Sequence, residues 1–132
     1  MYKHADITEK IIGVFYDVYN ELGHGFLESV YKHAMLLALS EAGLNAETEK
    51  AITVKFRDHT IGDFRADIIV ENKVILELKA GKALDASHEA QLLNYLRATE
   101  LEVGLLLNFG PKAEIKRLAF DNARKQNLRP SA

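Results

Sequence analysis

The stretch that decides the fold is Asp67-Ile68-Ile69-Val70-Glu71-Asn72-Lys73-Val74-Ile75-Leu76-Glu77-Leu78-Lys79. An apolar run stands on each side of the polar centre at Asn72, a pattern typical of a hairpin between two strands that are covered on both faces. A turn centred on Asn72 places Asp67 opposite Glu77, and directly opposed residues have Cβ atoms about 4.5–5.5 Å apart. Lys79 emerges on the same face as Glu77. The hairpin is therefore predicted to bring two carboxylates and one ammonium group together.

Such a patch suits metal-assisted hydrolysis of a phosphodiester. Two opposed carboxylates repel each other, and burial raises that cost unless a cation lies between them. Proteins bind Mg²⁺ through one or two carboxylates together with water and substrate phosphate, and the ion polarises the phosphate. Lys79 can orient or deprotonate the attacking water, or neutralise charge in the transition state. The alternative is a cross-strand ionic cluster in which Lys79 only neutralises Asp67 and Glu77, and a shift of one residue in register would separate that pair.

Two pairs of helical residues favour the first interpretation. Gln91 and Tyr95 are four residues apart and share one face of a predicted helix. Glu28 and Tyr31 are three residues apart, directly after Gly25, and can point the same way. Each pair also has a structural interpretation, since the helix dipole favours a carboxylate in the first turn and a helical tyrosine is more often a packing residue.

Two helices are predicted in the N-terminal part of the chain. Residues 6–22 carry apolar side chains at three- and four-residue spacing, with Asp6 as N-cap and Glu9 completing a capping box. A second helix is expected from about residue 27 to residue 42 and stops at Gly43. Its expected core-facing stripe is Leu27, Val30, Ala34, Leu37 and Ala38.

The remaining chain reads as strands around one further helix. Strands are predicted over residues 52–56, 61–70, 74–79 and 103–109, and residues 115–120 fit either an edge strand or a helical turn. A helix from the N-cap Ser87 to about Thr99 has its core positions at Leu92, Leu93 and Leu96. The order α-α-β-β-β-α-β, followed by one weak element, predicts an α/β fold with a mixed central sheet flanked by helices.

Length and composition set the limits of the interpretation. The chain has 132 residues, which predicts a single domain over residues 1–132. A hydrophobic fraction of 48% and a charged fraction of 27% exclude a disordered or collagen-like chain. Cysteine is absent, which excludes disulfides, thiolate zinc sites and cysteine nucleophiles. With no apolar run of about 18 residues and no secretory-signal pattern, we expect a cytoplasmic protein without a membrane partner.

The formal charge is −2, but it is unevenly distributed. Residues 112–132 carry six basic and two acidic side chains, so this segment contributes +4 and residues 1–111 contribute −6. The asymmetry allows a local phosphate-binding surface on an acidic protein. The alternative is a solvated, slightly basic tail.

Taken in order, these motifs resemble the PD-(D/E)XK nuclease superfamily. Asp67, the run Glu77-Leu78-Lys79 and the pair Gln91/Tyr95 are similar to the RecB-like branch, in which a Q-x-x-x-Y helix follows the E-x-K strand. The run Gly25-Phe26-Leu27-Glu28-Ser29-Val30-Tyr31 resembles the GxxExxY family within that superfamily. Residues 65–67, 77–80, 88–97 and 104–110 also look like that family, so that the resemblance covers about residues 6–120. Ala66 stands where the superfamily name has proline.

The resemblance implies a restriction-endonuclease-like core with Mg²⁺ or Mn²⁺ at the sheet edge. Asp67 and Glu77 match the metal-binding acids, and Lys79 matches the catalytic lysine. The further residues that the motifs assign are Glu28, as an additional helix-borne metal ligand, and Gln91 and Tyr95, which steady the site and the nucleic-acid backbone. Tyr31 has a supporting place beside Glu28. His88 lies three residues before Gln91 on the same face, and we prefer a packing or capping role over catalysis for it.

We therefore expect a metal-dependent nuclease, with DNA as the favoured substrate. The alternative is a catalytically silent nuclease-fold module that binds or scaffolds with a protein partner, since nucleic-acid binding rests largely on basic contacts and the protein is acidic. A homodimer or a partner subunit would complete the binding groove in either case. A small-molecule hydrolase is disfavoured because the chain has neither a phosphate-cradling glycine loop nor a Ser/His/Asp order.

Overall fold

The hairpin around Asn72 forms in the predicted register. In the computed structural model, which describes residues 3–125, β4 (Ile68–Val70) pairs antiparallel with β5 (Val74–Lys79). Ile69 faces Ile75, so the pairing is symmetric about Asn72. Glu71 and Asn72 adopt left-handed backbone angles, with φ of 54° and 52°, as a tight hairpin turn requires. The sequence pattern therefore fixed the register on which the predicted site depends.

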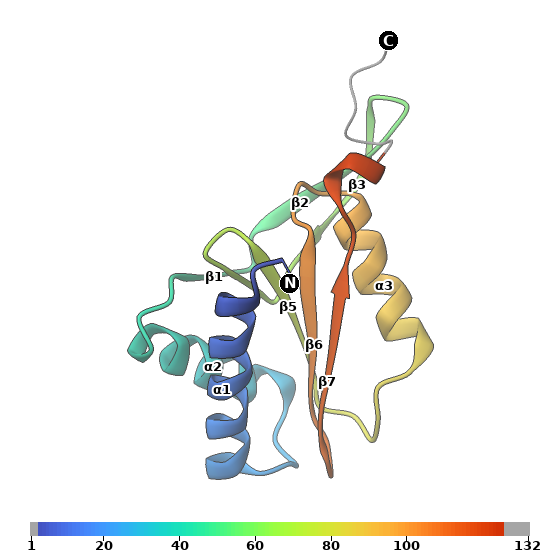
Figure 1. The fold of residues 1–132 in the computed structure, drawn as a ribbon. Coiled ribbons are helices and arrows are strands. Elements are labelled where there is room, and N and C mark those ends of the chain that lie inside the picture. Colours follow the sequence, from blue (N-terminus) through green and yellow to red (C-terminus); the bar gives the residue numbers. More distant parts are fainter. Residues whose placement is uncertain (1–2, 126–132) are drawn as a thin grey trace.

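This hairpin lies within a mixed five-stranded sheet, with the strand order β1-β4-β5-β6-β7. The β5–β6 pair is parallel and is connected by helix α3, whereas the other three pairs are antiparallel (Figure 1). The predicted strand over 103–109 is present, and the undecided segment forms an edge strand. The bounds of these elements are β1 (Ala46–Thr48), α3 (Ala86–Arg97), β6 (Val103–Phe109) and β7 (Ala113–Ala119).

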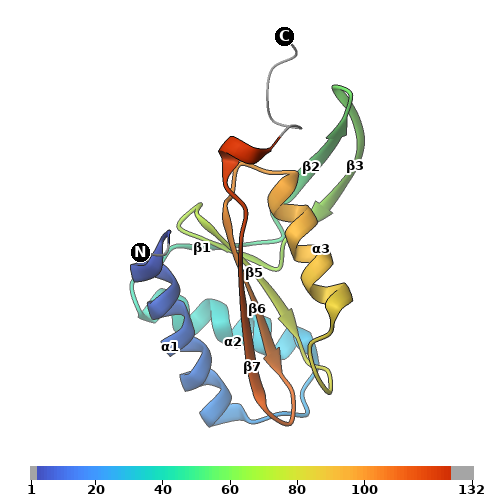
Figure 2. The ribbon, with the colours of Figure 1, turned by 45° about the vertical axis from the view of Figure 1, so that its right-hand side comes forward.

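Helices cover both faces of the sheet. Helices α1 (Ala5–Leu22) and α2 (Glu28–Glu41) lie on one face and α3 lies on the other (Figures 1 and 2). Alternation along β5 sends Leu76 and Leu78 into the larger core beneath α1 and α2, and Ile75 into the smaller core beneath α3. Glu77 and Lys79 therefore point to the α3 face. All seven residues of β6 are buried, as expected for a strand covered on both sides.

A second sheet consists of two strands alone, β2 (Ala51–Phe56) and β3 (His59–Arg65), which form a hairpin that projects from the body (Figure 2). The strand predicted over residues 61–70 is thus divided between β3 and β4, with a break at Ala66-Asp67. Strand β1 was not predicted, because its three residues carry no apolar alternation. A short 3₁₀ helix, η1 (Asn122–Arg124), follows β7.

Local details of the helices differ from the sequence prediction. Asp6 lies inside the first turn of α1 rather than at the N-cap, which is His4 and makes no side-chain cap. In α2 the buried stripe is Tyr31, Met35 and Leu39, whereas the predicted Leu27, Val30 and Leu37 are exposed and Ala34 and Ala38 are half-buried. Because α2 is apolar on two sides, periodicity alone could not choose between the two stripes. The N-cap of α3 is Asp85 rather than Ser87, and Leu93 is only half-buried.

No helix within residues 3–125 is long and apolar enough to cross a membrane. The predicted basic segment over 112–132 is described only as far as Lys125, so that Arg129 lies outside the described residues.

Lys125 stabilises the loop between α3 and β6 through two hydrogen bonds. Its side chain is buried, and Nζ donates hydrogen bonds to the backbone carbonyls of Thr99 at 2.8 Å and Leu101 at 2.6 Å. Burial lowers the pKa of Lys125, while the charges of Glu102 and Asp121 oppose that shift. The ammonium group thus satisfies two backbone carbonyls of this loop.

Replacing Lys125 by Met tests this contact. The variant keeps the apolar stem but leaves two carbonyls without a donor, so we expect the free energy of unfolding in urea to fall by about 1–3 kcal/mol. The matched control is Lys112→Met, at an exposed lysine, which should change it by less than about 0.5 kcal/mol. Equal effects of the two substitutions would contradict the assignment.

Candidate active site

Strand β5 extends beyond the point where β4 begins. The two strands pair only as far as Ile68 and Leu76, so that Leu78 has no strand beside it on that side. The Asp67 carboxylate takes the place of the missing strand, because its Oδ2 accepts the backbone N–H of Leu78 at 2.8 Å. Thr48 of β1 holds the same residue by donating its hydroxyl to the Asp67 carbonyl at 3.0 Å. The break in the strand therefore fixes Asp67 at an open edge of the sheet.

Glu77 is buried beside Asp67. Its exposed fraction is 7%, and within residues 3–125 no group hydrogen-bonds to its buried Oε1. Burial, followed by the charge of Asp67 and a hydrogen bond with its side chain, raises the pKa of Glu77 to about 8, although the backbone of Asp67 and the charge of Lys79 act in the opposite direction. At neutral pH the Glu77 carboxyl of the metal-free protein is therefore mostly protonated.

This pair fits a divalent cation. Carboxylate oxygens are the ligands that Mg²⁺ and Mn²⁺ prefer, and Glu77 Oε1 is a buried acceptor without a donor. A cation would remove the repulsion that holds the proton on the pair. Asp67 and Glu77 are thus residues that could hold the metal implied by the sequence motifs.

The α3 helix brings two further predicted residues to this face. Burial raises the pKa of the Tyr95 hydroxyl, and the charges of Glu77 and Asp67 raise it further, while a hydrogen bond with the Gln91 side chain opposes the shift. The Tyr95 ring stacks on Phe64 of β3, with centroids 3.5 Å apart and planes at 11°. The structure therefore brings Asp67, Glu77, Gln91 and Tyr95 together from the break before β4, strand β5 and helix α3.

Lys79 ends β5 on the same face and is half-buried. It pairs with Asn108 of β6, a buried polar residue that the sequence analysis gave no role. Asn108 holds the chain that follows Lys79, since its Oδ1 accepts the N–H of Gly81 at 3.0 Å and its Nδ2 donates to the Gly81 carbonyl at 3.1 Å. Its one signal in the sequence is an amide within an otherwise apolar strand. Asn108 is therefore a positioning residue for the end of β5.

Glu28 and Tyr31 lie on the opposite face of the sheet. Tyr31 is buried, its hydroxyl donates to the Gly23 carbonyl at 2.6 Å, and its ring stacks on Phe109 with centroids 4.1 Å apart. Glu28 is exposed in the first turn of α2. Within residues 3–125 no three His, Cys, Asp or Glu side chains are grouped to hold a metal, so Glu28 is not gathered with Asp67 and Glu77. Because Phe109 ends β6 at the level of Lys79, Glu28 nevertheless lies at the same end of the sheet.

His88 takes part in a capping box of α3. Its Nδ1 accepts the backbone N–H of Asp85 at 3.2 Å, and the Asp85 side chain accepts the N–H groups of Ser87 and His88. The local geometry supports the capping role that we preferred for this residue.

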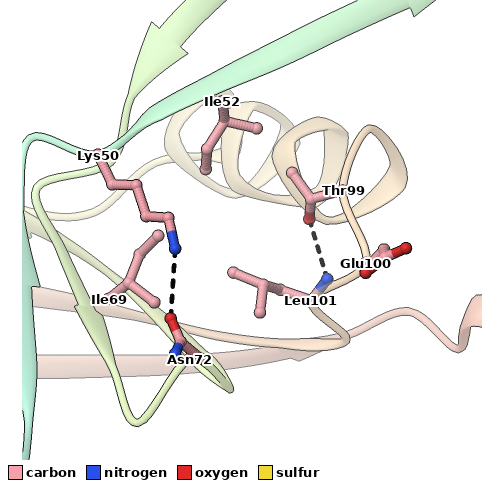
Figure 3. A pocket seen from close by; sticks show the side chains of 7 residues that line it. All are labelled: Lys50, Ile52, Ile69, Asn72, Thr99, Glu100 and Leu101. Atoms are coloured by element: carbon pink, nitrogen blue, oxygen red, sulfur yellow. Dashed lines mark hydrogen bonds between the residues drawn. The ribbon is translucent and has the colours of Figure 1, made fainter.

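A pocket of about 300 Å³ lies at the other end of the sheet (Figure 3). It is bounded by the β4–β5 turn at Asn72 and by the loop from Thr99 to Leu101, with Lys50 donating to Asn72 Oδ1 at 3.3 Å. None of the predicted site residues lines it, and Ile52 and Ile69 give it an apolar floor. It is therefore separate from the carboxylate pair.

Comparison with known proteins identifies the family. The model of the PD-(D/E)XK nuclease superfamily matches residues 5–118, and the chain belongs to this superfamily. The fold is similar to the crystal structure of SSO0001, with a TM-score of 0.56 and 20% identity over 70% of this chain and 50% of that chain. The chain thus spans about half the length of SSO0001. No curated protein sequence matches significantly.

A second similar structure is that of an alkaline exonuclease from Laribacter hongkongensis, with a TM-score of 0.45, 11% identity and coverage of 93% of this chain and 74% of that chain. The family match and the likeness to SSO0001 confirm the predicted α/β, restriction-endonuclease-like architecture.

The raised pKa of Glu77 predicts how pH affects stability. Because this pKa is about 8 in the folded protein and 4.5 ordinarily, the stability contributed by protonated Glu77 is fully present below pH 4.5 and is lost as the pH rises through 8. Glu77→Gln cannot ionise, so the Tm of the metal-free variant should exceed that of the wild type by an amount that grows across this window. Thermal unfolding in EDTA, followed by circular dichroism, measures the difference.

The matched control is Glu47→Gln, at an exposed glutamate of β1. Its Tm difference from the wild type should stay constant over the same pH range. A constant difference for Glu77→Gln as well would show that Glu77 does not hold a proton in the folded protein.

Proposed function

We propose that the protein is a metal-dependent nuclease that hydrolyses phosphodiester bonds, with DNA as substrate and Mg²⁺ or Mn²⁺ as cofactor. The observation that supports it most is the pair of half-buried Asp67 and buried Glu77, in which Glu77 Oε1 has no partner within the described residues. Membership in a nuclease superfamily supports the same reaction class. The GxxExxY assignment, the choice of DNA over RNA and the cytoplasmic location stay predictions from the sequence.

In this proposal Asp67 and Glu77 hold the ion. Glu28, whose helix begins at the same end of the sheet, would supply a third ligand to the ion. A bound divalent ion polarises the scissile phosphate and neutralises charge that develops on it.

The other polar residues of the α3 face act on substrate and water. The Lys79 ammonium lies on the face of Glu77 and donates to the attacking water or to a phosphate oxygen, where it stabilises negative charge. The Gln91 amide and the Tyr95 hydroxyl donate to the nucleic-acid backbone, and the stacking of Tyr95 on Phe64 fixes the position of that hydroxyl. Asn108 keeps Lys79 in place through its two bonds to Gly81.

The net charge of −2 favours one alternative, a binding or scaffold module without turnover that acts with a protein partner or as a homodimer. Such a module would bind metal at the same pair and leave the nucleic acid intact. Cleavage assays distinguish the two functions.

The first test measures cleavage of linear, circular and single-stranded DNA, and of RNA, with Mg²⁺ or Mn²⁺. Asp67→Asn and Lys79→Gln should each lower the rate by roughly a hundredfold or more, because both groups act on charge that develops in the transition state. Lys82→Gln removes the same charge from an exposed loop position three residues away and should leave the rate within about twofold. Cleavage that persists in the first two variants would remove this mechanism, and metal binding without any cleavage would establish the alternative.

A second test concerns Glu28. Glu28→Gln should raise the Mg²⁺ concentration that gives half-maximal cleavage by roughly tenfold, through loss of one charged ligand. Its Tm without metal should not change, since the side chain is exposed. The control is Glu41→Gln, at the exposed opposite end of α2. An unchanged metal requirement in Glu28→Gln would limit the site to Asp67 and Glu77.

A further inference from the structure

The β2–β3 hairpin has no packing partner over its outer half. Its two strands pair only with each other, and it projects past the end of α3 (Figure 2). Ile52, Val54 and Phe64 are half-buried, and the other residues of both strands are exposed. The hairpin therefore forms an arm of about a dozen residues that extends into solvent. Its outer residues do not contribute to the core beneath α3.

The base of this arm is attached to the candidate active site. Phe64 stacks on Tyr95 and pairs across the hairpin with Ile52. The chain then passes from Arg65 through the buried Ala66 to Asp67. The arm is thus held in a fixed position next to the carboxylate pair.

One face of the arm is apolar as far as its tip. Ile52, Val54 and Phe56 alternate along β2 and share a face, on which Ile52 contacts the core and Phe56 is 53% exposed. Gly62 lies opposite Val54, with open space where a side chain would stand. An aromatic ring therefore stands in solvent at the end of a surface that begins at Tyr95.

Two cations are neighbours of Phe56 in the sequence. Lys55 and Arg57 precede and follow Phe56, and the Arg57 guanidinium lies 4.9 Å from the ring centroid. The acidic residues of the hairpin are Asp58 and Asp63. Aromatic rings that stack on bases, together with cations that follow the phosphates, are the chemistry by which proteins bind single strands.

We infer that the β2–β3 hairpin is an arm that binds single-stranded nucleic acid next to the scissile phosphate. Phe56 stacks on an unpaired base, and the charges of Arg57 beside the ring and of Lys55 on the other face of the strand attract the phosphates. The inference rests on the proposed function, whose substrate class it specifies. Stacked bases inside a duplex do not offer their faces to Phe56, so an unpaired base is the partner that fits the ring.

The length of the arm sets the number of nucleotides between site and tip. Phe56 lies four residues beyond Ile52, which corresponds to about 13 Å along a strand. A single strand that leaves the carboxylate pair must therefore extend at least this far beyond the base of the arm before one of its bases reaches Phe56.

The test measures binding of labelled single-stranded DNA and RNA oligonucleotides, and of a blunt duplex of the same sequence, by fluorescence anisotropy in EDTA. Phe56→Ala should weaken single-strand binding at least about fivefold and change duplex binding less than about twofold. In a series of lengths, wild-type affinity should rise once the oligonucleotide is long enough to span site and tip, and Phe56→Ala should lack that rise. Lys55→Ala and Arg57→Ala should each lower the salt slope by about one, and Phe56→Ala should leave it unchanged.

The matched control is Tyr16→Ala, at an aromatic residue of α1 that is 43% exposed on the opposite face of the sheet. It should bind like the wild type, and both aromatic variants should keep the wild-type Tm. Unchanged single-strand affinity in Phe56→Ala, with active wild-type enzyme, would overturn the arm and leave the nuclease standing. Single-strand affinity that depends on Phe56, without any cleavage of nucleic acid, would support the arm and contradict the nuclease. No single-strand binding by the wild type, or a change of oligomeric state in Phe56→Ala, would also overturn the arm.

Discussion

The arrangement of the site depends on one hydrogen bond, from the N–H of Leu78 to the carboxylate of Asp67. Strand β4 begins only at Ile68, and the Asp67 carboxylate takes its place beside the next residues of β5. This position brings the Asp67 charge next to the buried Glu77. Burial and the charge of Asp67 raise the pKa of Glu77, so the metal-free protein keeps Glu77 protonated and loses stability when this carboxyl ionises. The extensive apolar packing of Leu76 and Leu78 against α1 and α2 on the opposite face offsets that loss.

The two faces of the central sheet have different roles. The α1 and α2 face supplies packing, and Tyr31 serves there to hold the loop before α2. The α3 face carries the polar residues that can act on a substrate. Asn108 holds the chain after the end of β5, and Phe64 links Tyr95 to the projecting hairpin. The acidic net charge is then less of an obstacle to binding a polyanion, because a divalent ion would neutralise the buried pair and local cations stand at Lys55 and Arg57.

The sequence predicted a feature correctly where its apolar pattern is compatible with a single arrangement of the chain. The register around Asn72 was predictable because two apolar runs flank it symmetrically, and with it the juxtaposition of Asp67 and Glu77. The buried stripe of α2 was not, since the helix is apolar on two sides and only the hydrogen bonds of Tyr31 inside the core select one of them. The break that separates β3 from β4 and the placement of Glu28 depend on contacts between distant segments, which no local period encodes.

The central claim is that the Asp67–Glu77 pair exchanges a proton for a divalent cation. The most direct measurement is calorimetric titration of the metal-free protein with Mn²⁺ at pH 7, in buffers of different ionisation enthalpy, which counts the protons released on binding. Because the pKa of Glu77 is raised to about 8, we predict binding with release of about one proton, and no such release in Glu77→Gln. Binding of Mn²⁺ without proton release, or no binding at all, would contradict the account.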